Sequence, residues 1–104
     1  MMNDDQNMDV AAVFELMNNT SFTIEHFIQL IELIQSSSDK FILTAIVGFR
    51  KLVSLVKNPP IQSIIDANLL PVILGLLNRQ DIPRIQFEAL WTLTNVASGK
   101  EEYV

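Results

Sequence analysis

The sequence carries one apolar pattern twice, in two stretches whose aligned positions differ by 44 (85 − 41). In both, apolar residues recur with the 3.6-residue period of an α-helix, and Ala45 aligns with Ala89 and Ser54 with Ser98. The inward positions of the first are Phe41, Ile42, Ala45, Ile46, Phe49, Leu52 and Val53, and those of the second are Ile85, Gln86, Ala89, Leu90, Leu93, Val96 and Ala97. A helical unit that repeats at this length buries its apolar face by stacking on its neighbour, which predicts a solenoid.

Helical spacing accounts for the rest of the chain as well. We expect helices at about 10–17, 23–35, 40–56, 61–67, 69–78 and 83–98. Thr23 can cap the second of these, residues 36–39 and 57–60 are breaks, and Gly99 stands where a glycine ends the last one. Helix 69–78 is apolar nearly all round, so it should be buried. Because no segment alternates with a period of two, the sequence predicts an all-α fold, and the short, medium and long helices of 61–98 favour a three-helix armadillo unit.

Composition narrows the class of function. The 104 residues allow one small domain, and the longest apolar run, 69–77, is far shorter than the roughly 20 residues of a membrane span. The acidic N-terminus lacks the features of a signal peptide. Since there is no cysteine, disulfides are excluded and a zinc site is not expected. The net charge of −5 argues against a nucleic-acid surface and allows a basic partner.

The single tryptophan lies on an unexpected side of its helix. Trp91 and Asn95, four residues apart, share the arc opposite the apolar stripe, where Glu88 and Ser98 flank them. A large aromatic side chain beside an amide has two interpretations. Trp91 packs on a neighbouring element, or the pair faces a ligand, with the indole as a flat wall and the amide as a clamp for a peptide backbone.

Several short motifs resemble one family. They are Arg50-Lys51-Leu52-Val53-Ser54, Pro59-Pro60-Ile61, Ile65-Asp66-Ala67, Ile85-Gln86-Phe87-Glu88-Ala89 and Leu93-Thr94-Asn95-Val96-Ala97-Ser98-Gly99. Over about 23–100 they resemble the first two armadillo repeats of importin-α, an adaptor of nuclear import. The resemblance implies a right-handed armadillo α-solenoid of about two repeats. Its parts are an acidic tail with a short helix (1–22), repeat 1 (23–57), repeat 2 (58–99) and the start of a third repeat (100–104).

The resemblance also implies a binding site. In that family the third helices line a groove in which Trp indoles hold the stems of Lys or Arg of a nuclear localisation signal and Asn amides hold the peptide backbone. Trp91 and Asn95 match the second-repeat positions, and Ser98 and Gly99 match the edge of the same pocket. The implied partner is a basic linear peptide of a cargo protein, with no nucleic acid, membrane, metal or cofactor. The implied localisation is the cytoplasm and the nucleus.

The sequence departs from the family pattern at several places. Val47 and Lys51 occupy the first-repeat positions of the Trp-Asn pair, Lys100 stands where many members have Thr, and Val72 where many have a basic residue. Residues 1–22 hold no Lys or Arg, which argues against importin-β binding through the N-terminus. Two repeats are fewer than the three or so that a solenoid needs. We therefore expect a truncated product, or self-association through the uncovered face of the last helix.

A second class of function stays open beside peptide binding. A structural or regulatory module would dock another helical protein through its apolar repeat face, at Leu93 and Val96, without cargo. An enzyme is not expected, because the sequence shows no Ser-His-Asp set, no glycine-rich phosphate loop and no paired catalytic carboxylates. The sole histidine, His26, has no suitable metal-ligand partners beyond Glu25 or Glu32, and we expect it to be solvated or capping.

Overall fold

The computed structural model describes residues 26–55 and 58–102. These residues form five helices and no strand: α3 (Phe27–Ile34), α4 (Asp39–Val53), α5 (Ile61–Asp66), α6 (Leu70–Leu76) and α7 (Pro83–Glu102). The all-α prediction is confirmed. The expected helix at 10–17 and the Thr23 cap lie outside the described residues. Within the described part of the chain, no helix combines the length and the apolar character needed to cross a bilayer.

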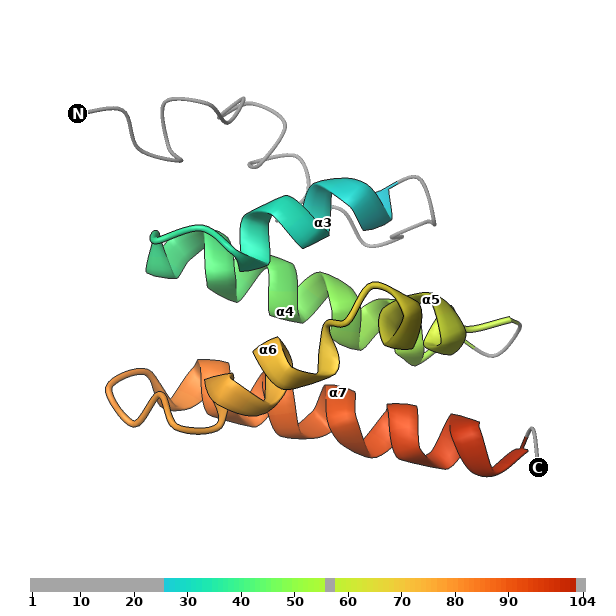
Figure 1. Ribbon diagram of the computed structural model, residues 1–104. Coiled ribbons are helices and arrows are strands. Elements are labelled where there is room, and N and C mark those ends of the chain that lie inside the picture. The colour runs from blue at the N-terminus through green and yellow to red at the C-terminus, as the bar shows by residue number, and fades with distance from the viewer. Residues whose placement is uncertain (1–25, 56–57, 103–104) are drawn as a thin grey trace.

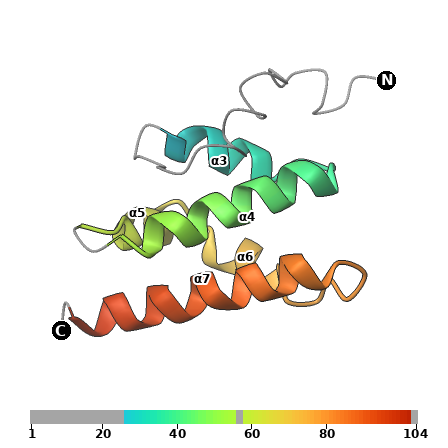
Figure 2. The same cartoon turned by 180° about the vertical axis from the view of Figure 1, so that it is seen from behind.

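Helices α3, α4 and α7 lie one below another in Figure 1. Helix α4 lies between α3 and α7 and packs against both, while α6 packs against α7. Seen from behind, α4 and α7 run side by side on one face, with α5 and α6 on the other (Figure 2). The two long helices that carry the repeated apolar pattern are therefore neighbours, which is the stacking that a helical repeat requires.

Local signals in the sequence set the ends of two helices. The Ser38 side chain accepts a hydrogen bond from the Phe41 backbone N–H at 3.4 Å and caps the start of α4. At the end of α5, Asn68 adopts a left-handed conformation with φ of 59°. Its N–H donates to the Ile65 carbonyl at 3.0 Å, and the Leu69 N–H donates to the Ile64 carbonyl at 3.2 Å. This is a Schellman motif with asparagine in the usual glycine position, and it turns the chain from α5 into α6.

The core runs continuously between the two repeats. Phe27 and Phe49 meet edge to face with ring centroids 5.6 Å apart. Buried apolar residues from all five helices surround them: Leu30, Leu33, Ile34, Phe41, Ile42, Ala45, Ile46, Leu52, Val53, Ile61, Ile64, Leu69, Ile73, Leu76, Ile85, Ala89 and Val96. The predicted inward positions of the first stretch are all among them.

The second stretch is rotated relative to the prediction. Ile85, Ala89 and Val96 are buried as expected, but Leu90 is 56% exposed. Ala97 is also exposed. The buried face of α7 includes Glu88 and Thr92 instead, although Glu88 was expected on the outer flank. The prediction was wrong because it assumed that every carboxylate lies at the surface. Glu88 is buried, and its charge is compensated by an ion pair with Arg50 of α4.

The end of α7 also differs from the prediction. The helix continues through Gly99 to Glu102, so Gly99 does not end it. A Cβ at Gly99 would collide with Cδ1 of Ile61. The glycine therefore serves close packing of α7 against α5, and its lack of a side chain is what the site requires.

Two expectations about apolar faces need correction. Helix α6 is not buried all round, because Pro71 and Gly75 are exposed and Leu74 is 52% exposed. The docking face assigned to Leu93 and Val96 is not an open surface either, since Val96 is buried and Leu93 is half-buried. The exposed large apolar side chains on α6 and α7 are Leu74, Phe87, Leu90 and Trp91.

Candidate functional site

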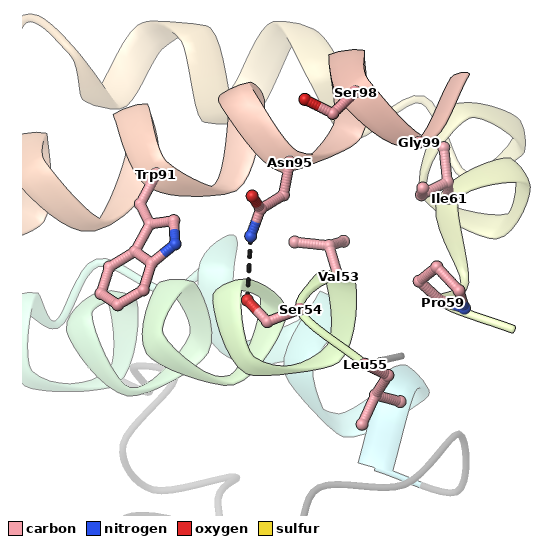
Figure 3. Close-up of a pocket in the computed structure, with 9 residues that line it drawn as sticks. All are labelled: Val53, Ser54, Leu55, Pro59, Ile61, Trp91, Asn95, Ser98 and Gly99. Carbon is pink, nitrogen blue, oxygen red and sulfur yellow. Dashed lines mark hydrogen bonds between the residues drawn. The ribbon is translucent and has the colours of Figure 1, made fainter. Parts of the chain in front are cut away.

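A pocket of about 560 Å³ lies where α7 passes the end of α4 and the start of α5 (Figure 3). All four residues that the resemblance assigns to a peptide site line it: Trp91, Asn95, Ser98 and Gly99. The other lining residues come from the junction of α4 and α5 and are Val53, Ser54, Leu55, Pro59 and Ile61. The pocket is therefore built jointly by α7 and by the segment in which α4 ends and α5 begins.

Trp91 is positioned by two ring contacts and remains 40% exposed. One helical turn before it, Phe87 meets the indole edge to face with ring centroids 5.8 Å apart. From α4, the guanidinium carbon of Arg50 lies 4.1 Å from the centroid of the indole. This distance is well within the range of a cation–π contact. The indole therefore packs on a neighbouring helix, as the first interpretation predicts, and it also lines the pocket, while the ligand-facing interpretation stays a prediction.

The Arg50 guanidinium is itself held by a carboxylate. Its Nε donates to Oε1 of Glu88 at 2.8 Å, and its Nη2 donates to Oε2 at 3.4 Å. The Nε of Arg84 donates to the same Oε2 at 3.3 Å from the exposed side. Glu88 is buried, so these two arginines compensate its charge where water does not. Arg50 is therefore not a solvated residue on the flank of α4 but one half of a largely buried ion pair.

The Asn95 amide is oriented by a chain of hydrogen bonds. The Ser54 hydroxyl donates to the Arg50 backbone carbonyl at 2.7 Å, so its single hydrogen is used. It can therefore only accept from Asn95, whose Nδ2 donates to it at 2.9 Å (Figure 3). This fixes which way the amide faces. The carbonyl Oδ1 and the second N–H of Asn95 are left for a donor and an acceptor of a bound peptide unit.

The rest of the lining is apolar and uncharged. Val53, Leu55, Pro59 and Ile61 form one end of the pocket, next to the bare helix surface at Gly99. None of the described residues that line the pocket is a carboxylate. The arrangement can therefore hold an extended backbone by its amide groups and a long side chain by its methylenes. It offers no general base, and no cluster of metal ligands is found among the described residues.

Sequence reasoning missed three residues that shape this site. Ser54 had a signal, because it aligns with Ser98 in the repeated pattern, yet its bond to Asn95 spans 41 positions. Arg50 and Glu88 stand in the motifs that carry the family resemblance, but nothing in the sequence pairs residues 38 positions apart. Their roles follow from the packing of α4 on α7.

Comparisons with known proteins identify the family of this chain. The family model of the Armadillo/beta-catenin-like repeat matches residues 57–98. Importin subunit alpha-B of Dictyostelium discoideum is 42% identical over 79 residues, which cover 76% of this chain and 15% of that protein. Importin subunit alpha-6 of Arabidopsis thaliana is 39% identical over 83 residues, covering 80% and 15%. Importin subunit alpha-2 of Arabidopsis thaliana is 50% identical over 60 residues, covering 58% and 11%.

The fold and the repeat match define an armadillo-repeat protein. Within that class, the chain belongs to the importin alpha family, because its relatives named here are all importin alpha subunits that match over more than half of its length. The chain spans about 15% of the length of the Dictyostelium relative.

Proposed function

We propose that this chain binds basic linear peptides of the nuclear localisation type and contributes to protein import into the nucleus as a non-enzymatic adaptor. One observation carries the proposal: Trp91 and Asn95 line the same pocket, and Ser54 orients the amide. The names of the relatives supply the biological setting, and movement between cytoplasm and nucleus follows from it. In this proposal residues 23–57 and 58–99 act as two repeats, and Ser98 and Gly99 form the edge of the peptide site.

The chemistry of the pocket suits a lysine or arginine side chain in an extended peptide. The methylene stem can lie against the indole of Trp91, where a nearby cation gains roughly 0.5–2 kcal/mol. The backbone of the same residue can bond to the Asn95 amide. Because the described lining holds no carboxylate, long-range attraction must come from the net charge of −5 rather than from a local ion pair. We therefore expect modest affinity that weakens as salt is added.

The fluorescence emission of Trp91 can report peptide binding, because this side chain lines the pocket. We would titrate a Lys-Lys-Lys-Arg-Lys peptide into the 104-residue chain and follow Trp91 emission at low and high salt, with Asn95→Ala as the comparison variant. A saturable shift that weakens with salt and with Asn95→Ala supports the proposal. A peptide of the same length with glutamine in place of each basic residue is the control. Equal responses to both peptides would refute recognition of a basic sequence.

A second function has its own observation. Leu74, Phe87 and Leu90 are apolar side chains on α6 and α7 that are each more than half exposed, and none of them lines the pocket. A structural or regulatory module would bury such side chains against another helical protein or a second copy of this chain. Binding through them would be insensitive to salt and to Asn95→Ala, and would be lost with Leu90→Asp. In neither function do we assign importin-β binding to residues 1–22.

A further inference from the structure

The contact between Arg50 and Trp91 joins the two repeats beside the pocket. Arg50 lies on α4 in the first repeat, Trp91 lies on α7 in the second, and the guanidinium carbon is 4.1 Å from the indole centroid. Trp91 lines the pocket, whereas Arg50 is not one of the lining residues. The part of the indole that the guanidinium covers is therefore not the part that faces the pocket. One side of the ring is occupied from within the protein.

The guanidinium is held rigidly enough to act as a support. Two nitrogens of its planar fork bond to the two oxygens of Glu88, at 2.8 Å and 3.4 Å. The Arg50 side chain is only 17% exposed and that of Glu88 only 3%. A bidentate pair of this kind fixes direction as well as distance. The indole thus rests on a group that cannot easily rotate away, even though the tryptophan itself is largely at the surface.

The positive charge of Arg50 would at first be expected to repel a basic peptide. Its charge is offset by Glu88 at 2.8 Å, so the pair acts on the pocket as a short dipole rather than as a free cation. Within the cluster of Arg50, Glu88 and Arg84, the charge that is left over is that of Arg84, whose side chain is 61% exposed and therefore screened by solvent. Support of the ring consequently outweighs repulsion in this geometry.

We propose that Arg50 is a positioning residue that holds the Trp91 indole in its peptide-accepting orientation, with Glu88 as the group that holds Arg50. The part of this inference that concerns peptide binding rests on the proposed function. The positioning itself is a property of the free chain. The indole then accepts one aliphatic stem on its open side, because the other side is already filled.

Arg50→Met tests the inference, because methionine keeps an unbranched apolar stem and removes the planar cation. The matched control is Arg84→Met, which removes the other arginine from the same carboxylate without touching the indole. Without peptide, we expect acrylamide quenching of Trp91 to rise about twofold in Arg50→Met, and its near-ultraviolet circular dichroism to weaken. With peptide, we expect the Kd to rise about fivefold. Arg84→Met should match the original chain in both measurements.

Arg50→Lys and the double variant R50M/E88Q extend the test. Lysine keeps the charge but loses the planar fork, so it should release the indole as methionine does. The double variant removes the charges of Arg50 and Glu88 together, so that no uncompensated carboxylate destabilises the fold. Unchanged quenching of Trp91 in whichever of these variants retains its helical circular dichroism would overturn the inference. If quenching of Trp91 increases in these variants but the original chain does not bind the peptide, the positioning role of Arg50 is supported and the proposed function is refuted. The two failures are therefore distinguishable.

Discussion

The Asn95 side-chain amide donates to the Ser54 hydroxyl at 2.9 Å, and this bond joins the third helix of one repeat to the end of the preceding repeat. Removing the hydroxyl should therefore weaken peptide binding by releasing the Asn95 amide. In Ser54→Ala the amide can rotate, and we expect the Kd of a basic peptide to rise about fivefold, the equivalent of one modest hydrogen bond.

Trp91 emission measures this effect, and Thr94→Ala is the control. Thr94 is exposed on the same helix and donates to the Leu90 carbonyl, outside the pocket. The melting temperature of Ser54→Ala should stay close to that of the original chain, since Ser54 is exposed. An equal loss of affinity in both variants would show that the Ser54 bond has no special role.

The buried Glu88 makes a prediction about stability. Glu88→Ala leaves Arg50, only 17% exposed, without its carboxylate, and we expect the free energy of unfolding to fall by about 3 kcal/mol. Arg84→Ala removes only a solvent-exposed partner and should cost less than about 1 kcal/mol. Urea unfolding followed by circular dichroism at 222 nm measures both. Losses of similar size in the two variants would show that the Arg50–Glu88 pair does not stabilise the fold more than the Arg84–Glu88 pair does.

Two helical glycines should respond in opposite directions to alanine. Nothing lies within 4 Å of a Cβ built at Gly75, and its φ is not positive, so Gly75→Ala should stabilise the chain by roughly 0.5–1 kcal/mol. At Gly99 the Cβ meets the buried Ile61 side chain, and repacking of about 1–3 kcal/mol should exceed the gain in helix propensity. Thermal melts of the two single variants decide the sign of each change. Stabilisation by Gly99→Ala would show that Ile61 can move aside freely.

The loop between α6 and α7 predicts a pH effect. The Arg79 guanidinium bonds to Asp81 at 2.9 Å and lowers the pKa of that carboxyl below its ordinary value of 3.8. Because the folded pKa is the lower one, the stabilising contribution is fully present above the unfolded pKa and is lost as the pH falls through the folded pKa. We expect Arg79→Met to melt below the original chain at neutral pH, and the gap to narrow as the pH falls through the lowered pKa of Asp81. A gap that widened with acid would contradict this assignment.

Sequence reasoning recovered the elements of the fold better than their rotation. The 3.6-residue period placed Ile85, Ala89 and Val96 in the core because burial follows apolar spacing along one helix. It could not place Glu88 there, because that carboxylate is buried only through an arginine on another helix. The same limit applies to Gly99, which reads as a helix end in isolation but packs against Ile61 in the fold.

The candidate site divides in the same way. The four residues brought forward by the family resemblance do line one pocket, and that juxtaposition was expected. Two residues hold them in place: Ser54 bonds to Asn95, and Arg50 contacts Trp91. The two residues of each pair are 41 positions apart in the sequence. Contacts of that span depend on how two helices cross, which local propensity and spacing do not encode.

The Arg50–Glu88 ion pair, the Arg50–Trp91 contact and the Ser54–Asn95 hydrogen bond all connect α7 to α4 or to the residue that follows α4, and the apolar end of the pocket comes from the junction of α4 and α5. In the proposed function, the binding unit is thus the joint between two repeats and not the repeat itself. A lone second repeat would keep its tryptophan and asparagine but would have neither the guanidinium behind the ring nor the hydroxyl beside the amide. We therefore expect that an array built from such joints would offer at most one site per joint, one fewer than its number of repeats.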